Sequence, residues 1–461
     1  MVEIRERAKG KRKYYERILS DSAGDERITQ IIEYRMTKVE KNGYIYFLLY
    51  NDEMNSIKEF FRYINIEMSH QSYNSREQSA HAIRQLYCYL ALSKTDIEKL
   101  SKKDIVNLQY FLLGYSTKNG TCSFKLKTQR KNNTVNDYIS IYRSYLKYLG
   151  VDCKYIADGR TTEYLTVNAL NETVSQKVTT FSSSLKEGTP VKRVPRYIIV
   201  DEFTDVIKII REDGNLAGEI IVRLMYEYGL RIGEVLGITN EDVTEKIVDG
   251  SLKPVIYIRN RVSDDKKYQS AKTLMKVDNK EVYSSPNYRQ EKIGFYVIYL
   301  TYDFYDILND FIEVTLSKMK RLNRLDKSIA DTVVRQKHYL ENHYIFLNGV
   351  GTPLSSKSWN EYIKTVFMKS NIHIDSGVKK HNLNHRFRHG FAMFQVKYRN
   401  VNAFELKEMM RHSSVCSTMI YYNPTEEDEY NMKTEFVEDL YNLIPALKER
   451  PDMYGEKINK T

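Results

Sequence analysis

Apolar residues recur at helical spacing through residues 50–150. One stripe covers residues 57–64, a second covers residues 80–90, and a third covers residues 138–149, where Gly150 supplies a stop signal. Between the second and third stripes, residues 117–133 are polar and rich in Lys and Arg. The pattern predicts a small helical domain over residues 46–171, with a basic loop between two of its helices.

Two stretches beside this domain lack a clear period. Residues 172–197 are rich in Ser and Thr and contain Pro190 and Pro195, which predicts a linker. Residues 1–45 open with a run of Arg and Lys that three glutamates interrupt. We expect this N-terminal basic segment to be either a nucleic-acid-binding arm or an ordinary solvated helix end.

The second half of the chain again favours helices. Residues 201–210 and 217–228 have one apolar face each, and Gly229 ends the second helix. Residues 255–258 and 294–300 are typical of strands, and further helices are expected from residue 303 onward. Residues 198–461 therefore form a predicted second domain with a C-terminal helical tail. The fold class predicted for the chain is mainly α, with a small antiparallel β-sheet in this domain.

Composition adds a partner class but does not locate it. The 461 residues carry 71 Lys and Arg against 60 Asp and Glu, a formal net charge of +11, which suits either a polyanionic partner or solubility alone. The four cysteines form no CxxC pair, which argues against a disulfide framework or a zinc ribbon and favours a reducing compartment. No signal core or run of about 18 apolar residues occurs, so we expect no membrane span.

Histidines are concentrated near the C-terminal end. Five of the nine fall within 40 residues, and His381, His385 and His389 are spaced to line one helix face. Two histidines at i, i+4 can hold zinc, so a metal-dependent hydrolase is one hypothesis. However, the neighbouring side chains are Lys379, Lys380 and two arginines rather than acids. Cations repel a divalent metal and favour a phosphate, so no metal or cofactor is predicted here.

Three motifs in register carry a resemblance to a known family. Residues 228–234 read Tyr-Gly-Leu-Arg-Ile-Gly-Glu, residues 385–389 read His-Arg-Phe-Arg-His, and Tyr421 follows His412 by nine positions. Together they resemble the first box, the His-x-x-Arg box and the third box of the tyrosine recombinases, the phage integrase family. The resemblance covers roughly residues 198–440. Residues 50–150 are similar, more loosely, to the core-binding domain of that family.

The resemblance implies a role for each motif residue. Arg231 and Arg388 would bind the scissile phosphate, because two always-protonated guanidinium forks neutralise its charge. His385 and His412 would add donors or assist proton transfer, and Tyr421 would be the nucleophile, with Tyr422 as its rival. The general acid would be a hairpin lysine, Lys272, although Lys266, Lys267, Lys276 and Lys280 remain alternatives. Supporting residues would be Glu234 and His389.

Sequence-independent DNA contacts are expected from further cations. Arg411 stands where the family usually has glycine, and it adds a cation beside His412. The basic loop offers four more candidates, for which a solvated loop is an equally good interpretation: Lys125, Lys127, Arg130 and Lys131.

The resemblance implies a site-specific DNA recombinase that works through a 3′-phosphotyrosyl intermediate without metal, ATP or cofactor. The helical and catalytic domains would clamp double-stranded DNA recombination sites, and a homo-tetramer would assemble, with accessory directionality or bending proteins as further candidate partners. Integration or excision of a mobile element in the bacterial cytoplasm, at the nucleoid, is the expected setting. The alternatives are a type IB topoisomerase and a catalytically decayed DNA-binding protein.

Overall fold

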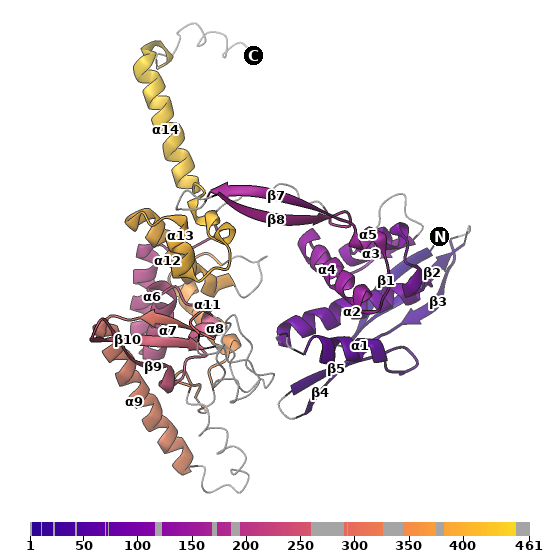
Figure 1. Ribbon diagram of the computed structural model, residues 1–461, viewed down its shortest axis with the longest axis horizontal. Helices are drawn as coiled ribbons and strands as arrows, with labels where there is room; N and C mark the ends of the chain where they lie inside the picture. The colour runs from indigo at the N-terminus through magenta and orange to yellow at the C-terminus, as the bar shows by residue number, and fades with distance from the viewer. Residues whose placement is uncertain are drawn as a thin grey trace. The chain divides into compact units, whose positions relative to one another are not determined.

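The computed structural model describes residues 2–10, 12–21, 24–41, 44–69, 71, 73–115, 122–167, 173–185, 194–259, 290–292, 294–325, 344–349, 351, 353–374 and 382–448 (Figure 1). Contacts between Cα atoms divide the chain into two compact units. The first unit joins Met1–Thr189 with Gly233–Ser356, and the second joins Pro190–Ile232 with Lys357–Thr461.

The N-terminal segment is folded into strands. A four-stranded sheet has the order β3-β2-β1-β6, in which β6 runs parallel to β1 and the other pairs are antiparallel. A separate antiparallel pair is formed by β4 and β5. The strands are β1 (Val2–Lys9), β2 (Arg12–Ser20), β3 (Glu26–Ile32), β4 (Arg35–Lys41), β5 (Tyr44–Tyr50) and β6 (Cys122–Lys125).

The expectation of an arm or a solvated helix end for residues 1–45 is therefore wrong. Ile4, Tyr15, Ile32 and Phe47 are buried in one core with the helices that follow. Arg5, Arg7 and Lys13 of the basic run form ion pairs with glutamates of the sheet. Examples are the Arg7–Glu16 pair at 3.0 Å and the Lys13–Glu6 pair at 2.9 Å.

The helices expected after this segment are confirmed. The first apolar stripe forms α1 (Lys58–Arg62) and a π-helical continuation (Tyr63–Glu67), the second lies in α2 (Tyr73–Ser93), and the third lies in α4 (Asn132–Tyr148). Two further helices are α3 (Lys102–Leu113) and α5 (Lys154–Ala157). The inward-facing residues of these helices share one core, which includes Ile83, Leu108 and Ile139.

Part of the expected linker is a strand. An antiparallel hairpin pairs β7 (Gly159–Val167) with β8 (Thr173–Phe181), so an irregular linker over residues 172–197 is wrong for this stretch. Two hydrogen bonds hold the residues after β8 to the helical part of the unit. Ser182 donates to Asp158 at 2.6 Å, and Gln109 of α3 donates to the Ser183 carbonyl at 2.5 Å. Ser and Thr suggested a loop, but Val and Thr are also the residues that favour strands.

The second stretch of the first unit contains the expected small sheet. Three antiparallel strands have the order β11-β10-β9, from β9 (Val243–Val248), β10 (Ser251–Arg259) and β11 (Phe295–Tyr299). The stretch also includes most of α8 (Ile232–Val235) and all of α9 (Tyr302–Leu325). The predicted strands at residues 255–258 and 294–300 are confirmed.

The second unit is helical. It contains α6 (Val200–Glu212), α7 (Leu216–Tyr226), α11 (Ser356–Lys369), α12 (Asn382–Arg399), α13 (Ala403–Met410) and α14 (Glu426–Leu443). Helices α12 and α7 pack so closely that Gly390 is required, since a Cβ there would lie 2.4 Å from Cε2 of Tyr226 and 2.6 Å from the Ile198 carbonyl oxygen. The predicted fold class, mainly α with a small antiparallel sheet, is confirmed. Among the described helices, none is long and apolar enough to cross a membrane.

Candidate active site

Helix α12 supplies three of the expected site residues. His385, Arg388 and His389 follow one another at i, i+3 and i+4, so they lie on one side of the helix. Burial differs along this side: His385 is exposed, His389 is half-buried, and Arg388 is only 3% exposed. Helix α12, which packs against α7, thus places the buried Arg388 guanidinium on the same side as the two imidazoles.

Arg388 links three segments of the second unit. Its guanidinium donates to the carbonyl oxygen of Gly229, two residues before Arg231, and to that of Met410, two residues before His412. Both acceptors are backbone groups at the ends of helices α7 and α13, where carbonyls lack helical partners. Arg388 therefore fixes the positions of the two loops that carry Arg231 and His412.

Gly229 is a backbone position that only glycine suits. Its φ is +62°, and a Cβ would lie 2.7 Å from Cδ1 of Phe391. Gly214 offers a matched control, because its φ is +64° but a Cβ would meet nothing within 4 Å. We expect Gly214→Ala to cost about 1–2 kcal/mol for the left-handed backbone. Gly229→Ala should cost about 1–3 kcal/mol more through overpacking, measured by urea unfolding. Equal losses in the two variants would contradict this packing.

Arg411 also adopts a left-handed backbone, with φ +53°, where it ends α13. This conformation accounts physically for the glycine that the family usually has at this place, since glycine adopts it without steric cost. The Arg411 side chain donates to the Gly229 carbonyl at 3.0 Å and to the Met409 carbonyl at 3.3 Å. The arginine thus secures the same turn as Arg388, and its contact with DNA stays a prediction.

Tyr421 is buried in a short 3₁₀ turn, Met419–Tyr422, and is 4% exposed. Its Oη lies 2.7 Å from Nδ1 of His389. The ring of His412 is parallel to the Tyr421 ring within 12°, with 6.4 Å between the centroids. Residues from α12, from the loop after α13 and from this turn therefore meet at one phenol.

Tyr422 faces a different neighbourhood. Its Oη donates to the Val401 carbonyl oxygen at 2.5 Å. Successive residues of a helical turn point about 100° or more apart, so the two tyrosines cannot share one site. The structure places Tyr421 beside His389 and His412, whereas the hydroxyl of Tyr422 contacts Val401. The choice of Tyr421 as nucleophile stays a prediction.

Charge and burial set the protonation of these groups. Burial, with the charges of His385, Arg388 and His412, lowers the pKa of His389 to about 3. Burial, with Arg388, Arg231 and Arg411, lowers the pKa of His412 to about 4. Both imidazoles are therefore neutral at pH 7. Burial raises the pKa of Tyr421 above its usual value, and the positive charges of Arg388 and Arg231 oppose that rise.

The remaining predicted residues fall into three groups. Arg231 is half-buried before α8, and its charge acts on both His412 and Tyr421. Glu234 is 2% exposed within α8. The general-acid candidates Lys272, Lys266, Lys267, Lys276 and Lys280 lie outside the described residues, as does His381. Sequence reasoning missed Thr418, which is fully buried and lies 3.0 Å from Nδ1 of His412 through its Oγ1. Within the described ranges, no group of three potential ligands could hold a metal ion.

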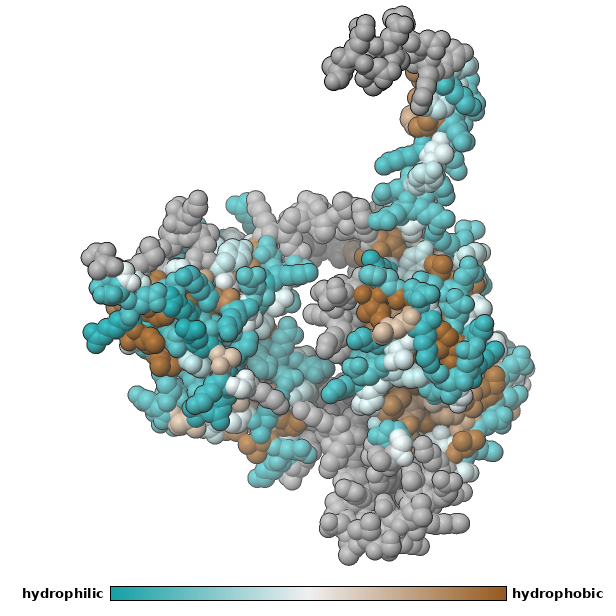
Figure 2. Space-filling model, turned by 180° about the vertical axis from the view of Figure 1, so that it is seen from behind, coloured by the Kyte–Doolittle hydropathy of each residue, from teal (hydrophilic) through white to brown (hydrophobic). Residues whose placement is uncertain are grey.

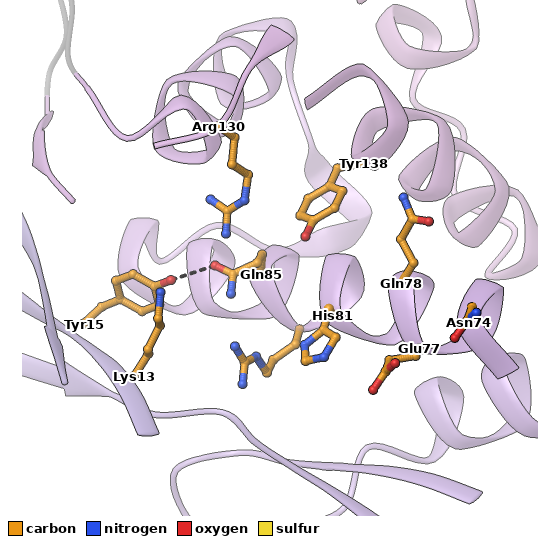
Figure 3. A pocket seen from close by; sticks show the side chains of 10 residues that line it. Lys13, Tyr15, Asn74, Glu77, Gln78, His81, Gln85, Arg130 and Tyr138 are labelled. Atoms are coloured by element: carbon orange, nitrogen blue, oxygen red, sulfur yellow. Dashed lines mark hydrogen bonds between the residues drawn. The ribbon is translucent and has the colours of Figure 1, made fainter. Parts of the chain in front are cut away.

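The predicted basic-loop contacts have different surroundings. Lys125 pairs with Glu3 at 2.9 Å, whereas Lys127 and Lys131 are exposed. Arg130 faces a cavity of about 510 Å³ between the N-terminal sheet and α2 and α4, shown in Figure 3.

This cavity is rich in cations. Lys13, His81, Arg84 and Arg130 line it together with one acid, Glu77, and with neutral polar side chains. Lys13 is neutralised by Glu6, but neither Arg84 nor Arg130 has an acidic partner among the described residues. Nε of Arg84 is buried without a hydrogen-bond partner in this part of the chain. No sequence pattern indicated this cluster, because Arg84 lies on α2, 46 residues before Arg130 in the sequence.

Parts of the chain are similar to known proteins. Residues 300–428 match the model of the phage integrase family, which includes the positions from His385 to Tyr421 but begins after Arg231. Over 213 residues, 45% of this chain and 56% of the relative, the chain is 23% identical to transposase A from transposon Tn554 of Staphylococcus aureus. The chain thus spans a little over half the length of the curated relatives it matches.

Similar solved structures include two DNA complexes. The Tn1549 transposon integrase in complex with transposon right end DNA is 14% identical, with 83% of this chain and 99% of that chain covered and a TM-score of 0.46. The XerH site-specific recombinase bound to difH substrate is 9% identical, with 82% and 84% covered and a TM-score of 0.45.

Proposed function

We propose, since residues 300–428 match the model of the phage integrase family, that the chain is a site-specific DNA recombinase whose nucleophile is Tyr421. The observation that supports this most is the convergence of Arg388, His389, His412 and Tyr421 within the second unit. In the proposed reaction, Tyr421 attacks the scissile phosphate, forms a 3′-phosphotyrosyl link and frees a 5′-hydroxyl. The 5′-hydroxyl of a partner strand then attacks that link.

Electrostatics accounts for the choice of residues. A phosphodiester is anionic, and its transition state gathers more charge, which Arg231 and Arg388 would neutralise with charged hydrogen bonds worth about 1.5–3 kcal/mol each. A free phenol has a pKa of about 10, so its ionisation at pH 7 costs about 4 kcal/mol. Burial of Tyr421 raises that cost. The attack of the Tyr421 phenol on the phosphate therefore needs a proton acceptor close to its hydroxyl.

The leaving oxygen needs a proton as well. We assign this donor role to Lys272, on the family resemblance, with the four neighbouring lysines as rivals. His385 and His412 would complete the phosphate site, and Glu234 would support Arg231. The energy of the cleaved bond stays in the phosphotyrosyl link, so the cycle needs neither ATP nor a metal.

A covalent trap tests this function. Purified protein is incubated with nicked duplexes tiled across the DNA that flanks its gene, and adducts are detected on a denaturing gel. The nick lets the freed fragment diffuse away, so the adduct accumulates. We expect an adduct without ATP and in the presence of EDTA, and its loss in Lys272→Ala. Absence of any adduct, or one that EDTA abolishes, would contradict the proposal.

The cationic cavity of the first unit is a candidate for the DNA backbone. Guanidinium groups without an acidic partner bind phosphate well, and each neutralised phosphate adds about 0.9 to the salt slope of binding. We expect the double variant Arg84→Gln, Arg130→Gln to lower this slope by about 2, measured by fluorescence anisotropy. The charge-matched control, Lys208→Gln with Arg211→Gln on the exposed face of α6, should change it less. Equal slopes in both double variants would refute the contact.

Helix α14 is a candidate for contact with a second protomer. None of its residues is buried, and the side chains of Tyr430, Met432 and Phe436 are 64–69% exposed. Figure 2 shows the surface of this helix as mostly hydrophilic with a few apolar spots. Such exposure is costly unless another surface covers it. We expect Phe436→Ser to leave the unfolding temperature unchanged but to prevent tetramer assembly on DNA, measured by mass photometry. Glu435→Ser on the same helix should assemble normally, and assembly by both variants would contradict this role.

The biological setting follows from the curated relatives. A transposase of a transposon is among them, which supports integration or excision of a mobile element. We propose that residues 46–171 and 198–461 grip duplex DNA as a clamp, joined by the segment between them. A bacterial cytoplasmic, nucleoid-associated protein with accessory directionality factors fits this role.

A further inference from the structure

His389 is the one imidazole among the described residues in direct contact with the proposed nucleophile. Nδ1 of His389 lies 2.7 Å from Oη of Tyr421. The other two histidines are placed differently. The His412 ring lies beside the Tyr421 ring, and its Nδ1 is 3.0 Å from Oγ1 of Thr418. The ring centroid of His385 lies 6.0 Å from that of His389. The third histidine of the cluster therefore has a contact that neither motif histidine makes.

The direction of this hydrogen bond follows from the phenol. Tyr421 is nearly fully buried, and His389 is its only hydrogen-bond partner among the described residues. If Nδ1 carried the proton, the phenolic hydrogen would be buried without an acceptor, which is costly. The phenol therefore donates to Nδ1, and the proton of the neutral imidazole is on Nε2.

We propose that His389 positions Oη of Tyr421 and accepts its proton during the attack on the phosphate. This inference rests on the proposed function and deepens it. The O–H bond of Tyr421 breaks as the Oη–phosphorus bond forms, and the proton moves to Nδ1 of His389. The bond from phosphorus to the 5′ oxygen breaks, and that oxygen takes a proton from the general acid. When a 5′-hydroxyl attacks the link, its proton passes to the deprotonated general acid, and the imidazolium returns its proton to the departing Oη.

The surrounding charges suit a base that is inactive before DNA binds. Burial and the positive or titratable groups around it, His385, Arg388 and His412, hold the pKa of His389 at about 3. The imidazole is thus neutral and able to accept, but it is a weak base. A bound phosphodiester brings a negative charge close to these groups, and a nearby negative charge raises the pKa of an imidazole. DNA binding would therefore raise the pKa of His389 and make it a stronger base. This would happen only when the phosphate that Tyr421 attacks is in place.

The first test needs no DNA. Long-range ¹H–¹⁵N spectra of the histidine rings report the tautomer, and loss of one ring signal in His389→Gln assigns it. We expect the Nε2–H tautomer at pH 7, with an Nδ1 shift that changes in Tyr421→Phe. A His389 ring protonated on Nδ1 would overturn the proposal. This result is independent of whether any duplex forms an adduct, so it separates this inference from the proposed function.

The second test follows single-turnover adduct formation on the nicked duplex. His389→Ala should be slower by about 100-fold or more, and added imidazole should restore the rate. His389→Gln keeps an acceptor but cannot take a proton, so it should be equally slow and lose the acid limb of the pH–rate profile. His373→Ala, an exposed histidine of the same unit, should cleave normally and show no response to imidazole. Cleavage by His389→Gln within threefold of the unmodified protein would overturn the proton transfer.

Discussion

Tyr421→Phe should abolish the covalent DNA adduct, with a rate loss of more than about a thousand-fold. The variant lacks only the hydroxyl that would bond to phosphorus. Its stability should fall by about 1 kcal/mol, because one hydrogen bond to a neutral partner is lost. Denaturing gels with nicked duplexes measure the adduct, and urea unfolding measures the stability.

Tyr422→Phe is the matched control. It also removes one phenolic hydroxyl that donates a hydrogen bond, in this case to the Val401 carbonyl. Its stability should fall by a similar amount, but its adduct should form within a few-fold of the normal rate. Adduct formation by Tyr421→Phe, or its loss in Tyr422→Phe alone, would show that the nucleophile has been assigned to the wrong residue.

Arg388→Lys should impair both folding and cleavage. The guanidinium donates to two buried carbonyls, those of Gly229 and Met410, and one ammonium cannot reproduce this fork. We expect the free energy of unfolding to fall by about 2–4 kcal/mol, from two weakened buried acceptors. Single-turnover cleavage should fall by about 100- to 1000-fold, since a fixed donor to the phosphate is displaced.

Arg211→Lys is the control for this change. Arg211 is an exposed arginine of the same unit that pairs with Glu219, so lysine can replace it at little cost. Its free energy of unfolding and its single-turnover cleavage rate should both stay near those of the unmodified protein. If Arg388→Lys unfolds at the same urea concentration as Arg211→Lys, the two carbonyl contacts do not stabilise the site.

The helices and the small sheet of the second half could be predicted because their signals are local. Each apolar stripe or glycine stop lies within about a dozen residues. The elements α6, α7, β10 and β11 lie where these local patterns predict them. The site could be predicted for a different reason. Motif spacing made His412 and Tyr421 candidates, and their rings lie side by side, while their roles stay a prediction.

Other features depend on contacts that are distant in sequence. Strand β1 pairs with β6 more than 100 residues away, and its Arg7 pairs with Glu16 of β2. The basic run alone therefore suggested only an arm or a solvated helix end. The partner of His389 is 32 residues away, and no pattern around either residue indicates that they meet. The same holds for Arg84 and Arg130, which only the packing of α2 and α4 brings to one cavity.

The central claim is that Tyr421 bonds to DNA, and the adduct itself can be read directly. The covalent complex on the nicked duplex is digested with a nuclease and a protease, and the modified peptide is sequenced by mass spectrometry. Tyr421 and Tyr422 fall on one peptide, so fragment ions between them decide the position. We predict a nucleotide on Oη of Tyr421. A nucleotide on Tyr422, or on any other residue, would contradict the account.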